Sequence, residues 1–261
     1  ESKVKDVKSG LKHSVLLTEG NEVYSWGHNN LGQLGFNLKD NKSNTKSEFN
    51  FETGEFFYYC GIPEIIPFFN KNNKTIIVKE ISCGNNFTIA VTNSGKLYGW
   101  GDNTHCQLGI DNAKSQTVCQ TEDESNFYFE DPVKISCYEY TNTLYPGHPV
   151  EESKMSKIIW GSEYAYAIST DLKLFFWGRS KYGLNLKLKN KIEKKPLHLH
   201  ILDAKKIQKL STYDNHVLAL GHWVELAFTH PSKPGVSITM KGIPNDYGVT
   251  DIETRYLSIF L

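Results

Sequence analysis

Short apolar stretches of strand length recur along the chain, each followed by a turn and a second apolar stretch. Inside them apolar residues stand at consecutive positions instead of alternating, as at Val15, Leu16 and Leu17. Consecutive apolar residues predict strands that are buried on both faces. The turns contain Gly, Asn or Asp, which favours hairpins. The first strands of three predicted hairpins are residues 13–18, 87–92 and 164–170.

Each predicted hairpin has a further extended stretch on either side of it. The stretch that follows has Pro near its start, which suits the beginning or edge of a strand because Pro cannot donate to the hydrogen-bond ladder. The sequence therefore predicts repeating units of four antiparallel strands. The three Pro-containing stretches are residues 62–69, 131–135 and 195–202.

The second strand of each hairpin ends in a Trp-Gly pair, and another Gly lies sixteen residues before each Trp. Three equal spacings indicate an internal repeat, and a long repeat period decides the fold before any local argument does. The repeated positions are Gly10, Trp26 and Gly27, then Gly84, Trp100 and Gly101, then Gly161, Trp177 and Gly178.

The residues around these positions resemble a known repeat. The first copy reads Val-x-x-Gly-x-x-His-Ser-x-x-Leu and then Tyr-x-Trp-Gly-x-Asn-x-x-Gly-Gln-Leu-Gly, which is similar to the regulator-of-chromosome-condensation repeat. The second copy matches at nearly every signature position, and the third lacks the Gln and the final Gly. The resemblance implies an all-β fold, a β-propeller with blades of four antiparallel strands. His13 occupies the repeat's own His position, where we expect a ring nitrogen to satisfy a backbone group at a blade junction.

The resemblance covers residues 1–221, as three recognisable blades and a partial fourth. A half-copy at residues 210–220 places His216 where the first copy has His13. Three and a half blades cannot close a ring, so we expect an incomplete propeller or one with blades missing from this chain. We place the units at about 1–75, 76–153, 154–204 and 205–221, and a C-terminal segment without the repeat, a candidate source of closing strands, at 222–261.

The first two units are longer than the about 40–50 residues that a blade needs. The excess falls in two insertions, residues 36–73 and 110–153, which are rich in aromatic residues. An apolar insertion needs a cover, either from the same protein or from a partner, and the sequence leaves both open. Aromatic side chains are enriched at interface hot spots. The candidate partner-binding residues are Phe56, Phe57, Tyr58, Phe127, Tyr128 and Phe129, with Trp223 in the C-terminal segment.

Composition limits the classes of function. The formal net charge is zero, so the chain as a whole lacks the electrostatic footprint of a nucleic-acid binder. Only Arg179 and Arg255 are arginines, which argues against direct sequence-specific base reading. The five cysteines form no C-x-x-C pair, which favours free thiols in a reducing intracellular compartment: mitochondrion, nucleus or cytoplasm. No apolar run reaches 18 residues, so we predict no membrane span.

No catalytic motif is present in the sequence: Gly-x-Ser-x-Gly, a phosphate-binding loop, a dinucleotide fingerprint and H-E-x-x-H are all absent. His198 and His200 share one face of a predicted strand and could begin a metal site. A strand with a polar outer face is the favoured interpretation, because no Cys or carboxylate cluster is near. We therefore predict no catalytic residues, no metal and no cofactor.

The resemblance implies a non-enzymatic propeller scaffold whose loops hold a protein partner in a larger intracellular assembly. An organellar ribonucleoprotein of the mitochondrial-ribosome type is one concrete version. One alternative is a guanine-nucleotide exchange factor for a Ran-type small GTPase, and another is the accessory propeller of a ubiquitin ligase. Fold analogy does not choose between them.

Overall fold

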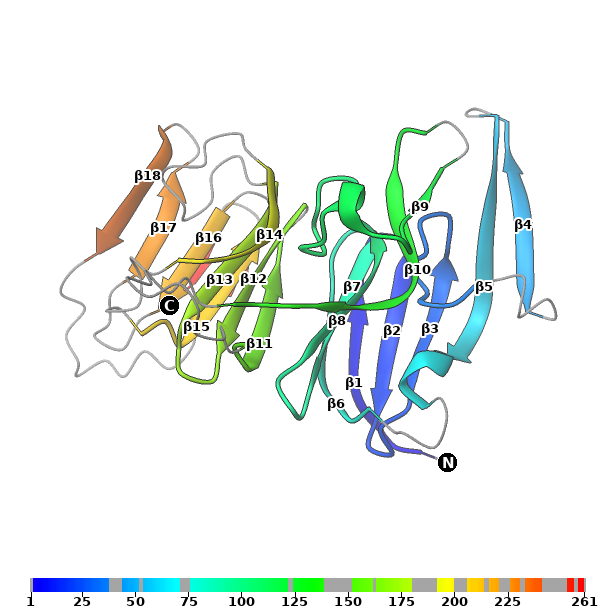
Figure 1. Cartoon of the computed structure of the whole chain (residues 1–261), viewed down its shortest axis with the longest axis horizontal. Helices are drawn as coiled ribbons and strands as arrows, with labels where there is room; N and C mark the ends of the chain where they lie inside the picture. The colour runs from blue at the N-terminus through cyan, green and yellow to red at the C-terminus, as the bar shows by residue number, and fades with distance from the viewer. Residues whose placement is uncertain are drawn as a thin grey trace. The chain divides into compact units, whose positions relative to one another are not determined.

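In the computed structural model the regular secondary structure of the described residues is almost entirely antiparallel strands (Figure 1). It forms two compact units, Glu1–Ile135 and Ser136–Leu261. The predicted all-β fold of antiparallel sheets is confirmed, with two described sheets of the expected four strands and two that carry a fifth. The residues that the structure describes are 2–37, 44–51, 54–70, 76–121, 124–138, 152–161, 163–179, 192–199, 206–213, 216–220, 226–230, 233–240, 253–255 and 258–260.

The first unit holds two five-stranded sheets, ordered β1-β2-β3-β5-β4 and β6-β7-β8-β10-β9. Their strands are β1 (Val4–Ser9), β2 (His13–Thr18), β3 (Val23–His28), β4 (Thr45–Asn50), β5 (Glu55–Ile65), β6 (Val78–Cys83), β7 (Phe87–Thr92), β8 (Leu97–Asp102), β9 (Cys119–Gln120) and β10 (Phe127–Ile135). Two 3₁₀ segments, η1 (Pro67–Asn70) and η2 (Asn112–Lys114), lie in the connections. Among the described residues no helix is long and apolar enough to cross a membrane.

The second unit holds two four-stranded sheets, β11-β12-β13-β14 and β15-β16-β17-β18, and a two-stranded sheet, β19-β20. The strands are β11 (Met155–Trp160), β12 (Tyr164–Ser169), β13 (Leu174–Arg179), β14 (Ile192–His198), β15 (Lys209–Tyr213), β16 (His216–Leu220), β17 (Leu226–His230), β18 (Lys233–Met240), β19 (Glu253–Arg255) and β20 (Ser258–Phe260). The boundary expected at residue 221 falls inside the fourth sheet. The last two strands of this sheet, β17 and β18, carry no Trp-Gly signature, so the repeat pattern does not reveal them.

The repeated glycines occupy equivalent places in the first three sheets. Gly27, Gly101 and Gly178 have φ values of 107°, 97° and 91°. A Cβ at these positions would lie 2.4–2.5 Å from the backbone carbonyl oxygen of the residue directly before β2, β7 or β12, so only Gly fits. The upstream glycines lie against the ring of the residue three positions later, which is His13, Phe87 or Tyr164.

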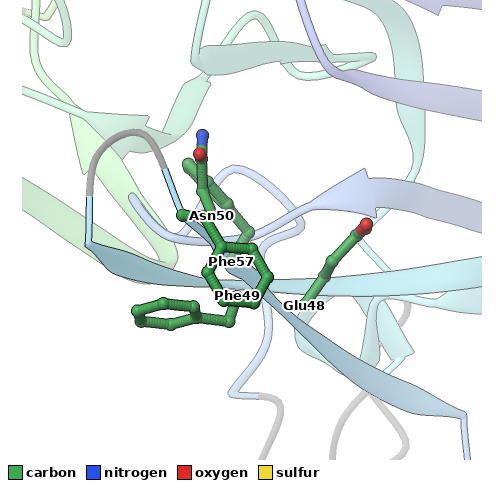
Figure 2. Close-up of a pocket in the computed structure, with 5 residues that line it drawn as sticks. Glu48, Phe49, Asn50 and Phe57 are labelled. Atoms are coloured by element: carbon green, nitrogen blue, oxygen red, sulfur yellow. The ribbon is translucent and has the colours of Figure 1, made fainter.

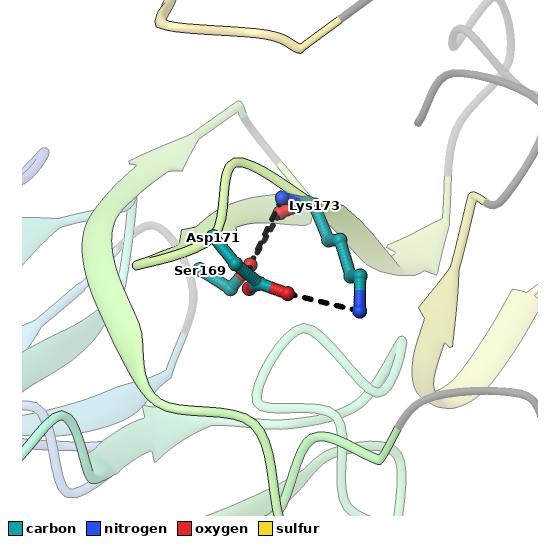
Figure 3. A network of polar contacts seen from close by, with 3 residues as sticks. All are labelled: Ser169, Asp171 and Lys173. Carbon is teal, nitrogen blue, oxygen red and sulfur yellow. Dashed lines mark hydrogen bonds and ion pairs between the residues drawn. The ribbon is translucent and has the colours of Figure 1, made fainter. Parts of the chain in front are cut away.

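The hairpin turn is also repeated. The hydroxyls of Thr18, Thr92 and Ser169 accept a hydrogen bond from the backbone N–H four residues later, at 3.0, 3.0 and 2.9 Å. In the third copy Asp171 adds an ion pair with Lys173 at 2.9 Å and accepts from the Ser169 hydroxyl (Figure 3). A side-chain hydroxyl that closes a turn in this way fixes the register of the strands around it.

The Asn-x-x-Gly-Gln-Leu-Gly part of the signature forms a tight loop in the first two sheets. The side chain of Asn29 accepts from the Leu34 N–H at 2.9 Å, and Asn103 accepts from Leu108 at 2.9 Å. The first loop then receives the Trp100 indole, which donates to the Gln33 carbonyl at 3.1 Å. Trp100 is fully buried, and the core of the first unit is continuous between its two sheets.

Candidate interaction surface

The first insertion forms a β-hairpin that extends the first sheet. The C-terminal half of β5 pairs with β3, and its N-terminal half pairs with β4 along all six residues of that strand. Aromatic residues favour strands, which explains why the run from Phe56 to Tyr59 is extended. The turn closes at Gly54, which has φ 73° and donates its N–H to the Asn50 carbonyl at 2.8 Å. The insertion therefore contributes two paired strands, β4 and β5, in its described residues.

One face of this hairpin exposes aromatic side chains. Phe49 lies directly opposite Phe56 with ring centroids 5.0 Å apart, and Tyr58 lies on the same face because side chains alternate along a strand. Phe51, in the turn, packs edge-on against Phe49 at 5.1 Å. The exposed fractions are 38% for Phe49, 90% for Phe51, 54% for Phe56 and 47% for Tyr58. We call these four residues the aromatic face.

The opposite face of the hairpin is fixed to the blade. The Phe57 ring lies 5.6 Å from the His28 ring and 5.4 Å from the Lys12 Nζ, and Tyr59 stacks on His28 at 6.2 Å. Burial, followed by the Lys12 charge, lowers the pKa of His28. These contacts hold Phe57 half-buried, so it supports the hairpin more than it presents a contact surface.

Asn30 clamps the hairpin backbone to the signature loop. Its side-chain amide donates to the Phe56 carbonyl at 3.0 Å and accepts from the Tyr58 N–H at 2.9 Å. The Asn29 N–H donates to the Tyr58 carbonyl at 2.9 Å. A surface held in this way loses little conformational freedom when it binds, which favours affinity.

The tip of the hairpin forms a shallow pocket, shown in Figure 2. Its lining combines the rings of Phe49, Phe51 and Phe57 with the carboxylate of Glu48 and the amide of Asn50.

The second insertion differs from the expectation. Phe129 on β10 is only 1% exposed, so it belongs to the core and cannot serve as a partner anchor. Phe127 and Tyr128 are half-buried, and the Phe127 backbone is held by the Thr104 hydroxyl at 3.1 Å and by the Asn103 N–H at 2.7 Å. The sequence could not separate these aromatics from Phe56 and Tyr58, because both groups are strand residues next to a turn.

Trp223, His198 and His200 are the remaining residues that the sequence singled out. Trp223 lies outside the described residues, as does His200. His198 is buried and stacks on Phe175 at 5.1 Å, so the polar outer face expected for this strand is wrong at that position. Within the described ranges, no group of three or more His, Cys, Asp or Glu residues could hold a metal ion.

His13 lies at the junction of the first two sheets. Its Nε2 is 2.9 Å from the Thr88 hydroxyl on β7, so its partner is a side chain and not the expected backbone group. Its Nδ1 is buried with no hydrogen-bond partner. Burial lowers the pKa of His13 to about 4, and the ring is therefore neutral at pH 7. A neutral imidazole in a closed junction is a structural element.

The repeat geometry agrees with the comparison against protein families. Two models of the Regulator of chromosome condensation (RCC1) repeat match the chain, one at residues 4–33 and 78–107 and the other at 21–91 and 94–137. The chain belongs to the RCC1 repeat family.

Relatives and solved structures extend this likeness. The human X-linked retinitis pigmentosa GTPase regulator is 34% identical over 118 residues, which are 45% of this chain and 10% of that protein. Human WBSCR16 superposes with a TM-score of 0.67 at 19% identity, covering 98% of this chain and 57% of its own. Prp20p of Saccharomyces cerevisiae, whose binding to Gsp1p and histones was studied with its structure, gives 0.60 at 16% identity, covering 97% and 52%. The chain thus spans about half or less of these proteins.

Proposed function

We propose that this chain is a non-enzymatic RCC1-type scaffold that holds a protein partner through the aromatic face of its first blade. The observation that carries the proposal is that the aromatic side chains are exposed while the hairpin that bears them is held in place. Four large apolar side chains face solvent on a hairpin that Asn30, Phe57 and His28 hold in place. Monomeric proteins rarely expose contiguous apolar patches without using them, and buried aromatic anchors dominate binding energy.

The setting we propose is a larger assembly in a reducing intracellular compartment, for which an organellar ribonucleoprotein is one version. All five cysteines are free thiols, in support of such a compartment. WBSCR16 and Prp20p support only the fold, because their identity to this chain is below 20%.

A binding assay tests the proposal. The variant replaces Phe49, Phe51, Phe56 and Tyr58 with Ser. Deletion of residues 36–73 is not usable, because Phe36, Ile66 and Phe69 are core residues. A matched control replaces exposed apolar residues elsewhere in the same unit, Leu11 and Ile77, with Ser. Partners captured and identified with the unchanged protein should be lost from the first variant at least about tenfold and retained by the control. Equal retention by both variants would contradict the proposal.

Guanine-nucleotide exchange on a Ran-type GTPase is the second candidate, favoured by the GTPase regulator among the similar proteins. An exchange assay with a fluorescent nucleotide separates the two. Under the scaffold proposal, catalytic amounts of the chain leave the nucleotide release rate unchanged. Acceleration of release would favour the exchange function instead.

A further inference from the structure

The outer edge of the first sheet is the strand β4. The sheet order places it last, after β5, and within the described residues no strand pairs with its other side. Four of its six residues are exposed, Lys46 to Phe49. A strand at the end of a sheet presents unpaired backbone N–H and C=O groups, which form a template for another strand.

The other outer strands of this unit carry features that discourage such pairing. β1 has a register shift between Val4 and Asp6, β6 has one between Val78 and Glu80, and β9 is two residues long. Bulges and very short edge strands are common protective devices. β4 has neither, because it pairs with β5 in one unbroken register.

The charged residues of β4 complement those of a second, antiparallel copy of the same strand. Lys46 and Glu48 are exposed on the same face of the strand, and neither forms an ion pair with a described residue. Charged residues on an edge normally repel an arbitrary strand. An antiparallel copy of β4 centred on Ser47 is different, because it places each Lys46 directly opposite the Glu48 of the other copy.

The two registers next to this one are unfavourable. A pair centred on position 46 places two lysines opposite each other, and one centred on position 48 places two glutamates opposite each other. Like charges directly opposite in a sheet are destabilising, whereas opposite charges are favourable. The sequence Thr-Lys-Ser-Glu-Phe-Asn of β4 therefore favours the antiparallel self-pairing centred on Ser47, the register that sets both charged residues opposite an opposite charge.

We propose that β4 pairs with β4 of a second copy of this chain, antiparallel and centred on Ser47, in a two-fold symmetric dimer. The two-fold axis runs perpendicular to the joined sheet, so the aromatic faces of both copies lie on the same side. One strand pair buries less than the about 1,200–2,000 Å² of a standard interface, so the dimer is weak and depends on concentration. The inference goes beyond the proposed function, since it requires no other protein.

Sedimentation velocity on the purified chain over a concentration series tests the proposal by charge exchange. Lys46→Glu and Glu48→Lys each place like charges at both symmetric positions, and each should weaken self-association about tenfold or more. The two variants mixed in equal amounts should associate with each other, because the mixture restores opposite charges. The double variant Lys46→Glu/Glu48→Lys should also regain self-association.

The control is Lys96→Glu, which makes the same charge change at an exposed turn on the second sheet and should leave association unchanged. Melting curves establish that every variant is folded. The proposal is overturned by an unchanged chain that stays monomeric at hundreds of micromolar. It is equally overturned by single variants that associate as well as the unchanged chain, or by a mixture that does not associate.

Discussion

The two insertions of the first unit begin from the same repeat and end differently. The first adds a six-residue strand β4 and leaves Phe49, Phe51, Phe56 and Tyr58 exposed. Among its described residues the second adds only the two-residue outer strand β9, and its strand β10 directs Phe129 into the core. A blade can therefore accommodate an aromatic insertion in two ways. It can add a strand to the edge of its sheet, or it can bury the aromatic side chains in its own core. Only the first route leaves a surface for another molecule.

The largest expected difference between the two insertions is in how much their aromatic residues contribute to the stability of the fold. Phe129→Ala should cost roughly 3–5 kcal/mol of unfolding free energy, because it empties a packed core site. Phe56→Ala should cost less than about 1 kcal/mol, since its ring is already half in water. Chemical denaturation of both variants provides the measurement. Similar losses for the two would end the distinction between the insertions.

A second test concerns His13, at the junction between the two sheets that carry the insertions. An unfolded His takes up a proton near pH 6.5, whereas buried His13 does so only near pH 4. Stability should therefore fall as the pH falls from 6.5 to 4 and should level off below that, with a total loss of about 3 kcal/mol from this residue. Denaturation at several pH values measures the loss.

His13→Gln is the control for the pH test, because it removes the titrating ring and leaves a polar side chain. The difference in slope between the two proteins isolates His13. A slope between pH 4 and 6.5 that is the same with and without the imidazole would contradict the assignment of a neutral ring at the junction.

The Asn30 clamp offers a smaller effect that is local to the first hairpin. Asn30→Ala should lower the free energy needed to open the hairpin by about 1–2 kcal/mol, because two hydrogen bonds to the hairpin backbone are lost. Hydrogen exchange should speed up at the Tyr58 amide. The Phe127 amide on the second hairpin, held by Thr104, serves as the internal reference and should not change.

The smallest expected effect is thiol reactivity. Cys60 on β5 is buried, whereas Cys119 on β9 is half-buried. Burial raises the pKa of both thiols, so both should react slowly at pH 7, with Cys119 reacting first. Mass spectrometry after brief alkylation reads the order. Faster labelling of Cys60 would mean that the first hairpin opens more readily than its contacts imply.

The repeat was predictable because its parts are local. The glycine spacings and the Trp-Gly pairs are fixed by backbone requirements that each residue type reveals. The separation of Phe129 from Phe56 was not predictable, because it depends on which face of each strand meets a neighbouring sheet. Phe49 and Phe51 were also missed, since the aromatic signal was taken from consecutive runs. A Phe-x-Phe pair beside a turn was the available signal.

Oxidative footprinting of the free protein and of its assembly with a captured partner reads directly whether the aromatic face is the contact surface. We expect Phe49, Phe51, Phe56 and Tyr58 to be strongly labelled in the free protein and protected in the assembly, while Phe129 stays unlabelled in both. Equal labelling of the aromatic face in the two states, or protection of that face in the free protein, would show that partners bind elsewhere.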